Sequence, residues 1–329
     1  MKKKNIVNQE FVPEEALSPD CSVSNEEFEW VGQDADKMQS IARESTSFWK
    51  DAFSRIKRDK VAITFMIILA VMVVLAIIIP AVYPYKFDQT DSIHQHVGMF
   101  FSGDGHFHIF GTDNLGRDMF ARIWRGARIS LFIAFAAVII NVIIGVIYGG
   151  IAGYFGGIVD NILMRIAEII NGIPYLLIVI LLMVIMEGGV FTIIVAYSLV
   201  GWVGTARLVR GEVMRLKEQE FVISAKSMGA SSARIIRKHM VPNILSIIIV
   251  NLTLAIPNAI FTEAFLSFLG LGVPLPEASW GTLANDGIVY FQQYPLELVL
   301  PAVFISITML SFNLLGDKLR DAFDPKLRR

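Results

Sequence analysis

The sequence has little charge and almost no cysteine. Only 18% of its 329 residues are Asp, Glu, Lys or Arg, whereas 54% are hydrophobic and the mean hydropathy is +0.56. A soluble domain usually carries about 25% charged residues, so this composition excludes a soluble enzyme and a nucleic-acid-binding protein. Cys21 is the single cysteine, which excludes an internal disulfide, a disulfide scaffold and a cysteine-based metal site.

Motifs for catalysis and for secretion are also missing. The sequence contains no Gly-Lys dipeptide, and therefore no P-loop that could hold the phosphates of ATP. No Ser/His/Asp set and no catalytic metal set emerges, so we expect a protein without enzymatic activity of its own and without a bound cofactor. The N-terminal residues are polar and acidic, and we expect no cleavable signal peptide.

The hydrophobic residues are gathered in long uncharged runs. A helix of about 20 apolar residues crosses a bilayer core of roughly 30 Å. We therefore expect an all-α polytopic membrane protein with six transmembrane helices, the last five of which form a core over residues 129–317. The predicted spans are residues 61–80, 129–151, 163–186, 190–208, 242–266 and 298–316.

Two polar segments precede the first span. Residues 1–44 combine many acids with prolines and lack an apolar period, so we interpret them as an acidic disordered tail. Residues 45–60 place Trp49, Phe53 and Ile56 at helical spacing among basic residues. This pattern predicts an amphipathic helix that lies in the membrane interface.

Lysine and arginine predict the orientation. With a cytoplasmic N-terminus, 24 of the 29 basic residues fall in cytoplasmic segments, among them a long loop, 209–241, and a tail, 318–329. The polar loop 81–128 is then external, although it contains four arginines between positions 117 and 128. The positive-inside rule thus predicts a multi-pass protein of the cell membrane with both termini in the cytoplasm.

The loop 209–241 contains a pattern of helix, glycine turn and helix. Phe221, Ala225 and Met228 are spaced to share one face of a short helix, and Gly229 suits the left-handed position that ends it. An exposed apolar face on such a helix calls for a groove on a partner. Alternatively, the helix folds back onto its own bundle, and the pattern alone leaves both alternatives open.

This segment resembles the EAA loop of ABC-importer permeases, whose pattern is Glu-Ala-Ala, three residues, Gly and a spacer to Ile-x-Leu-Pro. Ile223-Ser224-Ala225 stands where Glu-Ala-Ala belongs, Gly229 is in register and Pro242 closes the motif. In that family the loop is the coupling helix that docks on the ATPase. With Ile223 in place of the glutamate, the usual polar contact is absent or replaced. The residues to which the resemblance assigns ATPase coupling are Glu220, Phe221, Ile223, Ser224, Ala225, Lys226, Met228, Gly229, Ala230 and Arg237.

Two further segments are similar to signatures of the oligopeptide/dipeptide/nickel branch of these permeases. Gly111-Thr-Asp-Asn-Leu-Gly-Arg-Asp118 matches GTDxxGRD. Glu263-Ala-Phe-Leu-Ser-Phe-Leu-Gly-Leu-Gly272, followed by Ser279-Trp280-Gly281, matches EAxLSFLGLG…WG. The likeness is to the second permease of a pair, the OppC/DppC type, and it implies a type I ABC-importer permease with a MetI-like core.

The resemblance implies a transmembrane subunit of an ATP-driven importer for oligopeptides or dipeptides, which couples closure of the ATPases to alternating access. Its implied partners are a second homologous permease in a heterodimer, two ABC ATPase subunits that bind ATP and Mg, and an extracellular substrate-binding protein. The chain is also expected to contact the lipid bilayer, and no nucleic acid is expected as a partner. A nickel or metal-chelate importer is the alternative of the same architecture. An ion-coupled secondary transporter is the alternative of another class, and it would show paired intramembrane charges and two similar halves.

Six residues are candidates for a structural or pathway role: Asp113, Arg117, Asp118, Glu168, Glu263 and Trp280. The first three can pair with one another where the second span begins, or contact substrate. Glu168 lies one turn from Arg165, which predicts an ion pair at the membrane edge. Glu263 is expected to accept a hydrogen bond from the backbone of the loop at Gly270, or to serve the pathway. Trp280 is expected to be anchored near the membrane interface.

Four histidines form two alternating pairs, His94-x-His96 and His106-x-His108. Alternate residues of an extended segment point the same way, so each pair could chelate a divalent cation. Because the sequence indicates no third type of ligand, we favour solvated loop histidines and predict no metal site.

Overall fold

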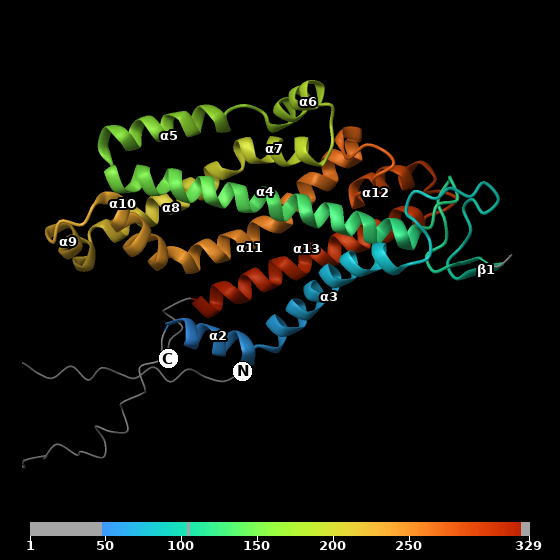
Figure 1. Ribbon diagram of the computed structural model, residues 1–329, viewed down its shortest axis with the longest axis horizontal. Helices are drawn as coiled ribbons and strands as arrows, with labels where there is room; N and C mark the ends of the chain where they lie inside the picture. The colour runs from blue at the N-terminus through green and yellow to red at the C-terminus, as the bar shows by residue number, and fades with distance from the viewer. Residues whose placement is uncertain (1–47, 104–105, 324–329) are drawn as a thin grey trace, which may run out of the picture. The chain divides into compact units, whose positions relative to one another are not determined.

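The computed structural model describes residues 48–103 and 106–323, which are mostly helical (Figure 1). The predicted acidic tail, 1–44, and the last six residues of the predicted tail 318–329 lie outside the described residues. The helices are α2 (Phe48–Arg58), α3 (Lys60–Val82), α4 (Met119–Phe155), α5 (Gly157–Asn171), α6 (Tyr175–Met186), α7 (Val190–Val200), α8 (Trp202–Lys217), α9 (Glu220–Ser227), α10 (Ser232–Arg234), η2 (Ile235–Met240), α11 (Val241–Leu266), η3 (Ser267–Leu271), α12 (Trp280–Val289) and α13 (Leu296–Phe323).

Within the described residues, five helical segments are long and apolar enough to cross a membrane. A sixth span exists if α5 and α6 count as one, but these two helices are bent by 75° relative to each other. The span predicted over 163–186 is therefore divided between two helices, α5 and α6, with a break inside it. Gly172 ends α5, and Pro174, which cannot donate a backbone hydrogen bond, precedes α6. The five segments are Lys60–Val82, Met119–Phe155, Val190–Lys217, Ser232–Leu271 and Leu296–Phe323.

The second span begins earlier than predicted, at Met119 instead of residue 129. Two arginines in its first turns do not interrupt the helix because both are neutralised by ion pairs, Arg122 with Asp113 and Arg125 with Glu277. The loop before α4 is correspondingly shorter than 81–128. It also contains an antiparallel hairpin of β1 (Phe101–Gly103) and β2 (His106–His108), which the all-α prediction omits.

The predicted interfacial helix corresponds to α2, which packs partly against its own chain. Ile56 is buried, whereas Phe53 is exposed. Asp59 separates α2 from α3, and its Oδ1 accepts the N–H of Val61 at 2.8 Å as a helix N-cap. Its Oδ2 lies 3.2 Å from Nζ of Lys318, which ties this corner to α13.

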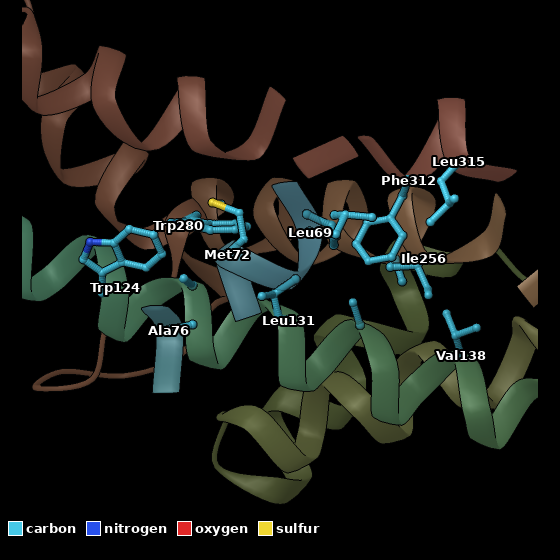
Figure 2. Packing of buried hydrophobic residues seen from close by; sticks show 14 residues of the cluster. Leu69, Met72, Ala76, Trp124, Leu131, Val138, Ile256, Trp280, Phe312 and Leu315 are labelled. Atoms are coloured by element: carbon cyan, nitrogen blue, oxygen red, sulfur yellow. The ribbon is translucent and has the colours of Figure 1, made fainter. Parts of the chain in front are cut away.

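The core of the bundle is organised around α4. One cluster joins α4 to α3, α11, α12 and α13, and Figure 2 shows its side chains. Of the 18 consecutive residues that are most apolar in the span containing α4, 56% are buried, against 22% in the spans of α3 and α13. The exposed apolar side chains of α3 and α13 are those expected of helices that face lipid or another membrane subunit.

Trp280 belongs to this core, and its expected position near the membrane interface stays a prediction. Its side chain is fully buried, and its indole Nε1 donates to the carbonyl oxygen of Ile123 at 3.1 Å. The tryptophan begins α12, which Ser279 caps together with Thr282 in a capping box. Trp280 thus fixes α12 against α4.

Three glycines of α4 let α8 approach closely. They recur every fourth residue, at Gly145, Gly149 and Gly153. A Cβ at Gly145 would lie 2.7 Å from Cβ of Thr205, and one at Gly149 would overlap the carbonyl oxygen of Ala206. This spacing of small residues brings membrane helices into backbone contact and gains van der Waals packing.

We predict that Gly149→Ala destabilises the protein. The added methyl group forces α4 and α8 apart, and overpacking of this kind costs about 1–3 kcal/mol. The melting temperature of the detergent-purified variant should fall by several degrees. Gly150→Ala is the matched control, because its Cβ would meet Cγ2 of Ile236 at an ordinary 3.5 Å. An equal effect of the two substitutions would contradict the close contact.

Candidate functional site

The predicted coupling residues lie on and around α9, at the end of the bundle far from the hairpin (Figure 1). α8 occupies the first part of the predicted loop 209–241, because it continues to Lys217. One face of α9 packs inward: Val222 and Ala225 are buried in a cluster with Val213 of α8 and Ile235 of η2. This face holds α9 against its own bundle.

On both flanks of this buried face, α9 and its C-cap carry exposed apolar side chains. Phe221, Ile223 and Met228 are 40%, 53% and 82% exposed, and we call these three residues the α9 patch. The sequence predicted that Phe221, Ala225 and Met228 form one exposed apolar face. This prediction is wrong for Ala225, which is buried. The fold-back alternative is confirmed for the buried face, and docking on a partner stays a prediction for the exposed side chains. Polar or charged side chains exposed around the patch are Glu220, Ser224, Lys226 and Arg237.

The glycine turn after α9 is confirmed. Gly229 has φ +79°, and its N–H donates to the carbonyl of Lys226 at 3.0 Å. The N–H of Ala230 donates to the carbonyl of Ala225 at 3.1 Å, which completes a Schellman motif. Ser231 then begins the next turn with an extended backbone, although its side chain makes no capping hydrogen bond. The exit of the chain from α9 is thus fixed by backbone hydrogen bonds.

A bidentate ion pair, which the sequence did not reveal, holds α8 to α5. Nε of Arg210 lies 2.5 Å from Oδ1 of Asp160, and Nη2 lies 2.5 Å from Oδ2. Asp160 is buried, and paired geometry of this kind fixes orientation as well as distance. The helix that leads into α9 is therefore tied to the first half of the bent span.

At the hairpin end, Asp113 binds two arginines. The predicted pair with Arg117 is confirmed, with Nε 2.8 Å from Oδ2. Arg122 of α4 also bonds Asp113, and its other Nη lies 3.2 Å from Oδ2 of Asp286 on α12. The two arginines and Asp113 are buried, so this balanced network of charges joins the loop, α4 and α12.

Asp118 does not pair with Arg117, contrary to the expectation. It caps α4 by accepting the N–H of Ala121 at 2.7 Å, and its Oδ2 lies 2.8 Å from Nδ1 of His108. Burial raises the pKa of the Asp118 carboxyl, while the hydrogen bonds from Ala121 and His108 act in the opposite direction. Asp118 therefore joins β2 to the start of α4.

We predict that Arg122→Met severely destabilises the protein. The substitution leaves Asp113 with one arginine in a buried site, and breaking a buried ion pair costs about 3–5 kcal/mol. Thermal unfolding in detergent measures the loss. Arg128→Met is the matched control, because Arg128 is an exposed arginine of the same helix. Similar melting temperatures for the two variants would show that the network contributes little.

Glu263 is bound by hydroxyl groups, not by the backbone near Gly270 as predicted. Its Oε2 accepts from Ser130 of α4 at 2.7 Å, and its Oε1 accepts from Ser267 at 2.8 Å. Ser279 donates onward to Ser267 at 3.2 Å. The carboxylate is fully buried and joins α11, α4 and the start of α12, which is a structural position.

The remaining predicted residues lie apart from these networks. Glu168 and Arg165 form the predicted ion pair at 3.1 Å, and both are exposed. One histidine of each alternating pair bonds a carboxylate elsewhere in the fold. Nδ1 of His96 lies 2.6 Å from Oε1 of Glu297 on α13, whereas His108 bonds Asp118.

A groove of about 410 Å³ lies along α8, α11 and α13, nearer to the α9 end. Its lining is mainly apolar, and its polar residues are Ser246, Asn251 and Arg320. Nδ2 of Asn251 also donates to Oγ1 of Thr205 on α8 at 3.1 Å. The predicted pathway residues do not line this groove.

Two protein families match two successive parts of the chain. Residues 142–329 match the binding-protein-dependent transport system inner membrane component family, and residues 47–98 match the N-terminal transmembrane domain of oligopeptide transport permease C. The chain belongs to the family of binding-protein-dependent transport system inner membrane components. It is accordingly a multi-pass membrane protein, and the predicted ABC-importer permease core is confirmed.

Individual relatives extend over nearly the whole chain. The dipeptide transport system permease protein DppC of Bacillus subtilis is 50% identical over 291 residues, 88% of this chain and 89% of that one. The oligopeptide transport system permease protein OppC of the same organism is 47% identical over 302 residues, 92% and 97% of the two chains. Escherichia coli OppC is 41% identical over 291 residues, 88% and 95% of the two chains. An inward-facing structure of the MetNI methionine ABC transporter aligns with a TM-score of 0.47 at 20% identity, over 60% of this chain and 94% of that chain.

Proposed function

We propose that this chain is a transmembrane subunit of an ATP-driven importer of oligopeptides or dipeptides. The names of its relatives support the substrate class. The α9 patch is the observation that carries the mechanism. The proposal includes a second homologous permease, two ATPases that bind ATP and Mg, and an external substrate-binding protein. The α9 end of the bundle then faces the cytoplasm, as the basic residues predict.

In this mechanism α9 docks in a groove of an ATPase subunit. Docking removes the α9 patch from water, and an apolar side chain of this size contributes about 1.5–3 kcal/mol when fully buried. Ile223 stands where the family motif has glutamate, and its exposed side chain enlarges the apolar contact. A hydrophobic surface thus replaces the usual polar one.

Movement of the ATPases passes from α9 into the bundle. α9 is packed on α8, and the Schellman turn at Gly229 limits its freedom to swing. From α8 the displacement reaches α5 through Arg210 and Asp160, and reaches α4 through the glycine contact. Since α4 continues to the hairpin end, a push at one face of the membrane changes the packing at the other.

We predict that Met228→Ala weakens coupling without unfolding the protein. The complex is reconstituted in proteoliposomes with both permeases, the ATPases and the binding protein, and peptide uptake is measured with ATP hydrolysis. Loss of about 1.4 kcal/mol of docking energy lowers the affinity for the ATPase about tenfold. Met214→Ala is the matched control, because Met214 is an exposed methionine of α8 outside the patch. Equal peptide uptake by both variants would show that the α9 patch does not take part in coupling.

We predict that Gly229→Val uncouples ATP hydrolysis from uptake. A side chain has open space at Gly229, but the left-handed backbone there costs a non-glycine residue about 1–3 kcal/mol. The strain opens the Schellman turn and releases α9. Gly211→Val separates backbone strain from added bulk, because Gly211 also has open space and lies within α8. Full peptide uptake by a well-folded Gly229→Val variant would contradict the coupling role of this turn.

A further inference from the structure

The loop between α3 and α4 brings together three metal-binding groups that the transport mechanism does not use. One ligand atom from each of Asp91, His94 and His106 lies within 4.8 Å of the other two. Nδ1 of His94 is 2.8 Å from Oδ2 of Asp91, and the ring centroids of His94 and His106 are 5.1 Å apart. His94 is buried and the other two are half-buried. The cluster takes one histidine from each alternating pair, which is why neither pair identified it.

A third histidine beside this cluster, His108, has a buried nitrogen that no described residue bonds. Nδ1 of His108 lies 2.8 Å from Oδ2 of Asp118, and in the neutral imidazole that donates this hydrogen bond the lone pair is on Nε2. Among the described residues no group bonds this Nε2, although it is fully buried. An imidazole oriented by a carboxylate on its other nitrogen is the usual arrangement of a metal-ligating histidine.

Two residues of the cluster line a small cavity together with His108. Asp91, His106 and His108 all contribute to the lining of a space of about 20 Å³. A space of about 10–15 Å³ is enough for one water-sized particle. The site therefore has room for one ion without rearrangement of the loop backbone.

We propose that Asp91, His94 and His106 bind a divalent transition-metal ion, with Zn²⁺ as the best fit and Nε2 of His108 as a further ligand. Imidazole and carboxylate suit Zn²⁺, whereas Mg²⁺ and Ca²⁺ prefer oxygen ligands. Zn–N and Zn–O bonds of about 2.0–2.2 Å require the ligand atoms to move closer together than 4.8 Å, which side-chain rotation provides.

The bound ion would cross-link a loop in which no internal disulfide can form, since Cys21 is the single cysteine of the chain. It joins the segment at Asp91 and His94 to β2. The same loop contacts α12 through Asn114, whose Nδ2 lies 3.3 Å from the hydroxyl of Tyr290. Metal binding therefore stiffens the hairpin end of the bundle.

Zinc binding by the full-length chain tests the proposal. The protein is purified without a polyhistidine tag, stripped with EDTA, loaded with Zn²⁺ and passed through gel filtration, and bound metal is counted by mass spectrometry. We expect one Zn²⁺ per chain, no retention of Mg²⁺, and a rise of the melting temperature with Zn²⁺. His106→Gln and Asp91→Asn should each weaken Zn²⁺ binding at least about tenfold.

His239→Gln is the matched control, because it removes the fifth histidine, on η2 at the opposite end of the bundle. It should retain one Zn²⁺. Absence of Zn²⁺ from the wild-type chain, or equal loss in His239→Gln, overturns the proposal. If the site variants fail to fold, Co²⁺ titration of the wild-type chain decides. Four-coordinate d–d bands that Zn²⁺ abolishes support the site, and the weak bands of hydrated Co²⁺ overturn it. Because the assay needs no ATPase or peptide, its outcome is independent of the transport proposal.

Discussion

The bundle depends on how closely α4 and α8 approach each other. At Gly149 the backbones touch with no side chain between them, so the two helices behave as one rigid pair. α4 contributes side chains to every hydrophobic cluster of the described residues, and α8 leads directly into α9. A closely packed interior transmits displacement and does not absorb it. The glycine contact therefore places the α9 patch and the hairpin end on one mechanical element, although they lie at opposite ends of the molecule.

The buried charges occupy the two ends of this element. Asp113 and Arg122 lock the loop onto α4 at one end, and Asp160 and Arg210 lock α5 onto α8 at the other. A charge inside a membrane protein is expensive unless it is paired, and a paired charge gives orientation that apolar packing does not. Glu263 follows the same rule with serine hydroxyls as its partners. These groups hold helices together, which suits a transporter whose energy comes from ATPase subunits and not from a moving proton or ion.

The sequence predicted features that depend on neighbouring residues. Hydropathy located the spans, the left-handed turn at Gly229 followed from local helix-ending rules, and the pair of Arg165 with Glu168 lies within one helical turn. The sequence did not reveal contacts between residues that are distant from each other in the chain. Glu263 and Ser130 are 133 residues apart, and hydropathy averaged over a short segment contains no information about such a contact. The same averaging hid the 75° bend between α5 and α6, because mean hydropathy does not register the change of direction between Gly172 and Pro174.

The error at Ala225 has a physical explanation that bears on how α9 works. Helical spacing identifies residues that share a face, but the apolar residues of α9 cover a broad arc of the helix, so spacing cannot say which part of the arc is buried. The structure divides them by size: Val222 and Ala225 pack inward, whereas Phe221 and Met228 point outward. Small side chains let α9 lie close to α8, and large side chains provide area and adaptability for a partner surface. A helix that is anchored through one set of apolar side chains and exposes another can transmit force between two bodies, and the proposed coupling role requires this division.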